Sequence, residues 1–348
     1  MSNETEFRPL EADRPYKWIA KEIEASDPYK DYEKIFRLSM EYTGDSEIMS
    51  NMMYALTFSN FIPNPWGSEV VWRKDGGKVL HAPTDRMYET LYHNSTWWYY
   101  GPHHPKTLES IDVINKRHKY WAKQYPGAFS HVMDYTYVLT FSATLVHRFR
   151  LRLGISGFNE KQQIAAHLCL REFAKHFVVE QPGKPDEPWI PLASITTFPK
   201  NWDEVVAFCE DVENNHFEKT NGGHMIAESL IDHFAYAQFP PLLRPLGRAI
   251  VIALSLPQII EAHQIEPVNP ILGRIIVFVF GTWLWFAETF LPDPKIATQE
   301  IFQQNLRTKK TQDRENRRAV DRGFPKEFEK NHPGAEAWCP FKVNEKST

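Results

Sequence analysis

The stretch INKRHKYWAKQY, residues 114–125, carries the pattern from which the fold can be inferred. At about 3.6 residues per turn, a helix built from it has one apolar stripe roughly 100° wide, and its lysines project away from that stripe. His118 lies on the stripe, where a neutral imidazole needs a hydrogen-bond partner or a metal ion. It is therefore either a core histidine bonded to a backbone carbonyl or a ligand. The stripe consists of Ile111, Ile114, His118, Trp121, Ala122 and Tyr125, and the outward lysines are Lys116, Lys119 and Lys123.

Helical spacing of apolar residues recurs along most of the chain, so we expect a mostly helical, all-α fold. One segment differs, because short β-prone runs flank Asp75-Gly76-Gly77. An Asp-Gly pair in that setting predicts one small β-hairpin near residues 69–80. Helices are expected over residues 31–61 with a break near Gly44, after Pro83, and over 105–125, 129–153, 159–179 and 201–220.

The composition excludes several classes of protein. A chain of 348 residues with 42% hydrophobic residues is long enough to bury a sizeable core. Its net charge of −4 provides no electrostatic footprint for nucleic acid. The three cysteines, Cys169, Cys209 and Cys339, form no CxxC pair, which favours a reducing compartment and excludes a structural zinc site built on thiolates. The polar N-terminal stretch lacks a signal-peptide pattern, so we expect a cytoplasmic protein.

Two apolar segments lie late in the chain, at residues 246–260 and 275–287. The second is too short for an ordinary membrane span. We therefore expect buried helices here. The alternative is peripheral contact with a membrane through residues 246–290.

The common nucleophile and phosphate-binding motifs are absent from the sequence. The best metal-like pair is Glu213-x-x-His216, whose spacing places both side chains on one face of a helix. Di-iron helical bundles use two such pairs and two further glutamates, and the chain has no second ExxH. The pair is either a surface ion pair or part of a non-haem iron site.

Arg86, Glu89 and Thr90 lie on one face of the helix expected after Pro83, and 28 residues separate Thr90 from His118. That separation allows a helix end, a turn and a returning helix. The three side chains form either ordinary caps and ion pairs or, with His118, a small polar site in an apolar pocket.

The pattern R-x-x-x-T from Arg86 to Thr90, followed by N-x-x-H from Asn115 to His118, resembles the MpaB/rubber-oxygenase catalytic-domain family. That family includes the bacterial latex clearing proteins and the fungal oxygenase of mycophenolic acid biosynthesis. The resemblance covers roughly residues 35–290. Further similar segments follow in order: FSHVMDYTYVLTFSATLVHRFRLRLG, FNEKQQIAAHLCLREFAKHF, FPKNWDEVVAFCEDVENNHF and FPPLLRPLGRAIVIALSLP.

The resemblance implies a haem b whose iron is held by His118, with Arg86 and Thr90 near the distal side. The family's rubber enzymes have a lysine before the threonine, where this chain has Glu89. An anionic Glu89 would need a partner such as Arg86. The family pattern also includes a carboxylate base, and Glu69 is the nearest candidate by spacing.

Other residues of these helices suit a haem pocket. Arg86 and Arg117 offer cations for the propionates, and Trp121 offers an apolar wall. The division of the chain then becomes an N-terminal extension (1–30), a haem-binding catalytic domain (31–294) and a charged C-terminal extension (295–348).

The resemblance implies a haem-dependent oxygenase or related oxidoreductase of secondary metabolism. Its substrates would be O2 and an apolar small molecule, such as a prenyl chain or another natural-product intermediate, and its reactions would include oxidative C=C cleavage. Two alternatives stay open. One is a non-haem iron enzyme using Glu213 and His216, and the other is a non-catalytic helical protein that binds lipid or a partner. No pattern indicates an oligomeric state.

Overall fold

The computed structural model describes residues 14–42, 46–184, 186–308 and 312–335. Within these ranges the fold is all-α with one two-stranded hairpin, which confirms the predicted fold class. The first half of the chain forms α1 (Trp18–Ala25), α2 (Tyr32–Met40), α3 (Glu47–Phe58), η1 (Ser59–Phe61), α4 (Pro65–Trp72), α5 (Gly77–His81), α6 (Pro83–Tyr100), α7 (Pro105–Ala122), α8 (Val132–Arg152) and α9 (Glu160–Ala174).

Local sequence accounts for where many of these helices begin. Asn159 caps α9 and forms a capping box with Gln162. Proline occupies the first turn of α4, α6, α7, α13 and α14, where its missing N–H costs nothing. The second half of the chain forms β1 (Val178–Val179), β2 (Ile190–Pro191), η2 (Leu192–Ser194), α10 (Trp202–Asn215), α11 (Asn221–Gln238), η3 (Pro241–Leu243), α12 (Arg244–Leu254), α13 (Pro257–Ala262), α14 (Pro270–Phe290), α15 (Thr298–Thr308) and α16 (Gln312–Asn331).

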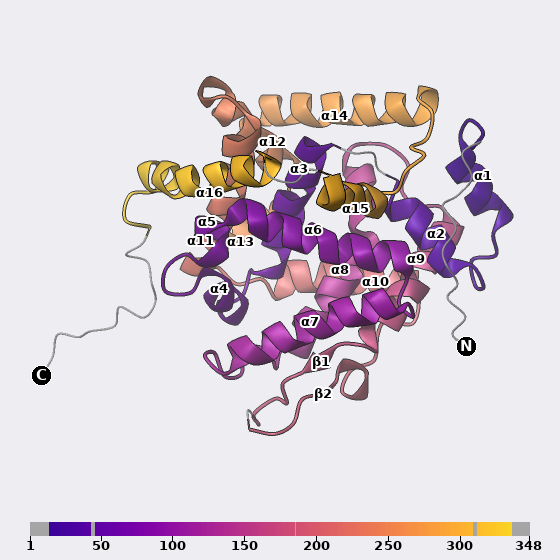
Figure 1. Cartoon of the computed structure of the whole chain (residues 1–348), viewed down its shortest axis with the longest axis horizontal. Helices are drawn as coiled ribbons and strands as arrows, with labels where there is room; N and C mark the ends of the chain where they lie inside the picture. Colours follow the sequence, from indigo (N-terminus) through magenta and orange to yellow (C-terminus); the bar gives the residue numbers. More distant parts are fainter. Residues whose placement is uncertain (1–13, 43–45, 185, 309–311, 336–348) are drawn as a thin grey trace, which may run out of the picture.

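The helix α6 runs through the middle of the molecule and contributes to two cores (Figure 1). Its Met87 belongs to a core built with α3, α11, α12 and α16. Its Trp97 packs against a second core formed by α2, α8 and α9. The neighbouring α7 returns along α6 and lies below it in Figure 1, with the β1–β2 hairpin lower still. Side chains of α6 and α7 therefore face each other along a long seam.

The predicted hairpin near residues 69–80 is wrong in its location. That segment forms α4 and α5, joined by a turn in which Gly76 and Gly77 have φ of 90° and 55°. The Asp-Gly pair does mark a turn, but Trp72 and Val79 on either side are buried in helices of the first core. The hairpin lies elsewhere, where Val178 pairs with Pro191 and Val179 with Ile190.

The chain ends contribute to the cores as well. Trp18 of α1 is buried, and Phe324 and Phe328 of α16 are buried in the same core as Met87. The predicted extensions over 1–30 and 295–348 therefore supply core residues wherever the structure describes them. Cys169 and Cys209 are buried and unpaired, and Cys339 lies outside the described residues.

The prediction that the late apolar segments form buried helices is only partly right. The helix α12 is buried on one side, but α14 lies across the top of the molecule in Figure 1 with most of its apolar side chains exposed. It is 21 residues long and is the one helix in the described part of the chain long and apolar enough to cross a membrane.

Candidate functional site

The helix α6 positions Arg86 and Thr90 one turn apart. Arg86 Nη1 donates to Thr90 Oγ1 at 3.4 Å, and this hydroxyl donates to the Arg86 carbonyl oxygen at 3.0 Å. The guanidinium also lies over the ring of Phe58, 4.8 Å from its centroid. Arg86 is thus held on the side of α6 that faces α3.

His118 of α7 is half-buried, as its place on the apolar stripe predicts. Its Nδ1 lies 3.2 Å from the hydroxyl of Tyr135 on α8, and its ring stacks on Phe129 with centroids 4.7 Å apart. Burial, and to a smaller degree the charge of Arg86, lowers the pKa of His118 to about 4. The imidazole is therefore neutral near pH 7 and lies within electrostatic reach of Arg86.

Tyr54 of α3 adds a third element beside Arg86 and Thr90. It is 2% exposed, and its hydroxyl lies close to Thr90. Burial raises the pKa of Tyr54 to about 12, although Arg86 and Thr90 oppose the rise.

Glu89 is paired, but its partners differ from the one predicted. Lys78 Nζ lies 2.8 Å from its Oε1, and Arg117 Nη1 lies 3.4 Å from its Oε2. Burial alone would raise the pKa of Glu89, but Lys78 and then Arg117 outweigh it and lower the value. Glu89 is therefore an anion that links α5, α6 and α7 and makes no ion pair with Arg86.

The remaining predicted residues lie at the margins of this group. Trp121 stacks against Arg73, whose guanidinium lies 3.7 Å from the indole centroid. Glu69 lies on α4 and has no side-chain hydrogen bond or ion pair with another described residue. Arg86 and Thr90 contact each other, and His118 lies within electrostatic reach of Arg86 but hydrogen-bonds to neither of them. Glu69 makes no side-chain hydrogen bond or ion pair with any of the three.

Glu213 and His216 do not form a shared site. Both carboxylate oxygens of Glu213 accept hydrogen bonds from Arg148 at 2.6 Å, and Tyr137 donates to one of them at 2.9 Å. His216 caps the end of α10 with non-helical backbone angles, and its Nε2 lies 3.4 Å from Asp211. The spacing argument fails because the helix ends one residue too early.

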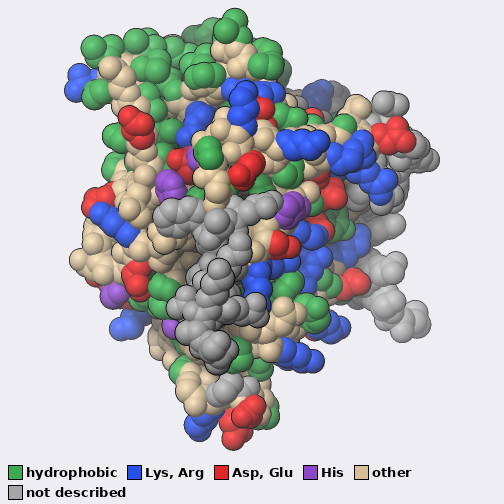
Figure 2. Space-filling model, turned by 90° about the vertical axis from the view of Figure 1, so that its left-hand side faces the viewer, with side chains coloured by type: hydrophobic (Ala, Val, Ile, Leu, Met, Phe, Trp, Pro, Cys, Tyr) green, Lys and Arg blue, Asp and Glu red, His purple; other side chains and the backbone are tan. Residues whose placement is uncertain are grey.

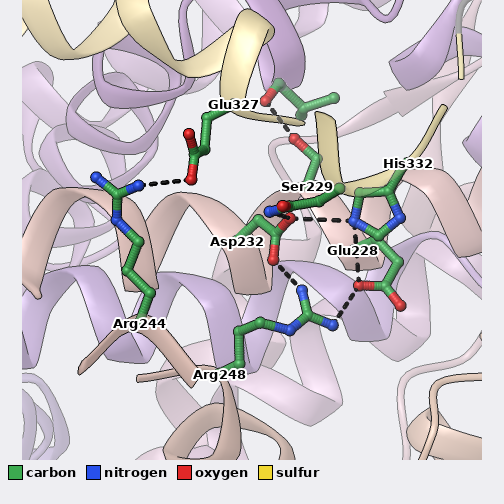
Figure 3. Close-up of polar contacts among 9 residues, drawn as sticks. Glu228, Ser229, Asp232, Arg244, Arg248, Glu327 and His332 are labelled. Carbon is green, nitrogen blue, oxygen red and sulfur yellow. Dashed lines mark hydrogen bonds and ion pairs between the residues drawn. The ribbon is translucent and has the colours of Figure 1, made fainter. Parts of the chain in front are cut away.

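A second polar cluster lies between α11, α12 and α16 (Figure 3). Glu228, Asp232 and His332 place ligand-type atoms within 4.8 Å of one another. Arg248 bridges the two carboxylates, with its Nη2 2.6 Å from Glu228, and it also pairs with Asp232. His332 Nε2 lies 3.0 Å from Asp232.

The positive charge of Arg248 offsets the negative charge of the two carboxylates in this cluster. Burial would raise the pKa of Asp232, but the hydrogen bond with His332 and the charge of Arg248 lower it. Arg248 pairs with both carboxylates and supplies a positive charge between them, so the cluster acts as an ionic link between α11, α12 and the end of α16. Arg244 and Glu327, 2.6 Å apart, make a second link between α12 and α16 (Figure 3).

Two cavities lie near α8, with volumes of about 320 and 410 Å³ that include space open to solvent. Both touch Asn60, and neither is lined by Arg86, Thr90 or His118. The lining of the first includes Phe61, Trp66, Asp134, Tyr137 and Phe217, and that of the second includes Met53, Leu56, Phe141, Phe149 and Leu254.

Comparison of the sequence with protein-family models finds no match, and a search among curated proteins finds none either. Function must therefore be inferred from the residues themselves.

Sequence reasoning missed several members of the site. Tyr135, Phe129 and Tyr54 belong to helices or loops whose approach to α6 and α7 depends on tertiary packing. His93 was also missed, although it follows Arg86 by seven residues on the same face of α6. Burial, with Arg117, lowers the pKa of His93 to about 4, and its Nδ1 lies 2.7 Å from Ser110. The recurrence of polar residues on one face of α6, at Arg86, Thr90 and His93, was the sequence signal that could have identified His93.

Proposed function

We propose that this chain binds haem b through His118 and uses it to oxidise an apolar small molecule with O2. The observation that carries this proposal is the half-buried, neutral imidazole of His118 beside Arg86. A prenyl chain or another natural-product intermediate is the substrate class, as the resemblance implies.

The contacts of His118 suit an axial ligand. Tyr135 holds Nδ1, while Nε2 has no hydrogen bond with a described residue. When Nδ1 carries the proton and donates it to the Tyr135 oxygen, the lone pair of Nε2 is free to bind iron. A hydrogen-bonded second nitrogen is the usual way in which proteins set the tautomer and orientation of such a ligand.

The groups around His118 match the other needs of a haem. Arg86 and Arg117 can bind carboxylates such as the propionates, and the hydroxyl of Tyr54 lies near Arg86 and Thr90 as a further polar group. Bound haem supplies the oxygen chemistry, which the protein tunes through the axial ligand and the polarity around it. The residues present therefore fit the donor chemistry of the group.

Proton transfer needs a carboxylate that is not already neutralised. Lys78 and Arg117 pair with Glu89, which keeps its carboxylate ionised and held between the helices. Glu69 has no ion pair with a described residue. Glu69 is therefore the better candidate for the base, with Arg86 and Thr90 orienting oxygen, a water molecule or the substrate.

The test is the visible spectrum of the protein purified from haem-supplemented cells. We expect a strong Soret band that His118→Ala abolishes while the far-ultraviolet circular dichroism stays helical. His216→Ala is the matched control, because this exposed histidine is the ligand of the non-haem alternative, and it should keep the band.

Other outcomes contradict the proposal. A wild-type spectrum without a Soret band would reject haem binding, and full haem occupancy in His118→Ala would reject the axial assignment. Iron bound without porphyrin, and lost in His216→Ala, would favour the non-haem enzyme instead.

A further inference from the structure

The surface of α14 is apolar to an extent that a water-exposed helix does not tolerate. The mean hydropathy of its most apolar 18-residue window is 1.7, and only 11% of that window is buried. Figure 2 shows hydrophobic side chains forming a continuous cap at the top of the molecule, where α14 lies. Exposed contiguous apolar surfaces of this kind mark interaction sites. The exposed side chains are Ile271, Leu272, Ile275, Phe278, Val279, Trp283, Trp285, Phe286 and Phe290.

These side chains occupy one arc of the helix. At 100° per residue they cover about 160° of its circumference, from Trp285 to Trp283. The opposite face packs on the protein, where Ile276 is buried and Gly281 lies against the Leu153 carbonyl oxygen. The exposed arc contains no charged residue. Thus α14 packs on the protein along one stripe, and its outward side is uncharged and apolar apart from Thr282 and Thr289.

Both ends of α14 are attached to the rest of the protein, so the helix lies along the protein surface. Its N-terminal half packs on α12. At its C-terminal end Tyr16 donates to the Thr289 carbonyl oxygen at 2.8 Å, and the next segment is held where the Thr298 N–H donates to Glu41 O at 2.8 Å. A helix of 21 residues is about 31 Å long. Anchored at both ends, it can enter one leaflet but cannot cross a bilayer.

The charges beside the arc favour a lipid surface. Arg274 lies at its edge and Lys295 follows its C-terminal end, and both are exposed without an ion pair to any described acidic residue. At the C-terminal end the acidic residues are neutralised, because Glu288 pairs with Arg150 and Asp293 with Lys17. Glu266, four residues before α14, is exposed without an ion pair to a described residue. Unpaired cations around an apolar face match the anionic headgroups of a bilayer.

We infer that α14 docks this protein on a lipid bilayer, lying in the interface with its axis parallel to the membrane plane. Tryptophan and phenylalanine suit the headgroup boundary, and Tyr16, 55% exposed beside the end of α14, extends the aromatic rim. The turn before α12 adds Leu242, 88% exposed, and Leu243. The His118 seam lies on the opposite side of the molecule, toward α7 (Figure 1), so the docking surface does not depend on the proposed function.

The first experiment is flotation of the full chain with phosphatidylcholine vesicles containing about one quarter phosphatidylglycerol. We expect the wild type to float and Phe278→Asp with Phe286→Asp to bind at least about tenfold more weakly. The matched control places the same charges on α7 as Leu108→Asp with Tyr120→Asp, and it should float like the wild type. Omitting the anionic lipid should weaken binding severalfold without abolishing it.

The second experiment needs no destabilising change. Brominated phosphatidylcholine should quench part of the tryptophan fluorescence of the wild type, and Trp283→Phe with Trp285→Phe should remove that quenching while flotation stays unchanged. Quenching that persists undiminished in this variant would overturn the inference.

Two flotation outcomes also overturn it. One is a wild type that does not float. In that case the oligomeric state decides the occupant. If the wild type forms dimers in solution and the double variant Phe278→Asp with Phe286→Asp does not, a second copy of the chain covers α14. The other is binding that vanishes without anionic lipid, which would indicate electrostatic adsorption without insertion of the apolar arc.

Discussion

The hydroxyl of Tyr135 lies 3.2 Å from Nδ1 of His118 and so joins α8 to α7. This contact comes from 17 residues further along the chain, and it supplies the partner that the apolar stripe of α7 demands. A tyrosine hydroxyl can accept from Nδ1 or donate to it, unlike a backbone carbonyl, which can only accept. The tautomer of His118, and with it the availability of Nε2, therefore depends on Tyr135.

Tyr135→Phe tests this dependence. Without the hydroxyl, Nδ1 loses its partner and the ring its fixed orientation, so the affinity for haem should fall roughly 10- to 100-fold. Titration of the apo-protein with haemin, followed in the Soret region, measures the change. Tyr120→Phe on the exposed side of α7 is the control and should bind like the wild type. Equal affinities for both variants would show that the Tyr135 contact does not position the ligand.

Glu41 predicts a pH-dependent stability. Its buried carboxyl accepts from Ser95 Oγ at 2.9 Å and from the Gln299 N–H at 2.9 Å, and so links α2 to α6 and α15. Burial, only partly opposed by these hydrogen bonds, raises the pKa of Glu41 to about 8. The unfolded chain releases the proton near 4.5, so the stabilising effect of the protonated group is complete below that pH and is lost as the pH rises toward about 8.

Glu41→Gln should remove that loss. Between about pH 5 and pH 8 the wild type should lose at least about 1 kcal/mol more stability than the variant, as measured by urea unfolding. Glu109→Gln, at an exposed position of α7, should leave the wild-type pH profile unchanged. A Glu41→Gln profile parallel to that of the wild type would contradict the raised pKa.

Two glycines of α14 make a matched pair. A Cβ at Gly281 would collide with the Leu153 carbonyl oxygen, whereas a Cβ at Gly273 meets nothing within 4 Å. Gly281→Ala should therefore lower the free energy of unfolding by about 1–3 kcal/mol. Gly273→Ala should raise it by up to about 1 kcal/mol, because alanine is the better helix former. Urea unfolding measures both, and changes of the same sign would contradict the close approach of Gly281 to Leu153.

Local sequence predicted most helices and their faces because neighbouring residues decide them. The apolar stripe of α7 is confirmed by the burial of Ile111 and Ala122 and the exposure of its lysines. The Asp75-Gly76 signal was read correctly as a turn and wrongly as a hairpin. Turn chemistry does not encode whether the flanking residues pair as strands or pack in helices, and here Trp72 packs on Phe328, more than 250 residues away in the chain.

The apolar segment at 275–287 shows a second limit of local sequence. Its composition indicates that it avoids water, but composition does not say whether protein or lipid covers it. The fold decides this, because α11 and α12 already fill the core and leave α14 outside, on a single packing stripe.

The all-α class, the caps of several helices and the inward face of His118 could be predicted from local sequence, since all of these follow from residues within a few positions of one another. Only the tertiary structure decided the partners. The packing of the helices brings the hydroxyl of Tyr135 to Nδ1 of His118 and pairs Glu213 with Arg148, so that Glu213 does not meet His216. It also lets Arg248 form ion pairs with both Glu228 and Asp232. Such contacts depend on how helices distant in the chain pack, and the repeat of apolar residues along one helix carries no information about its neighbours.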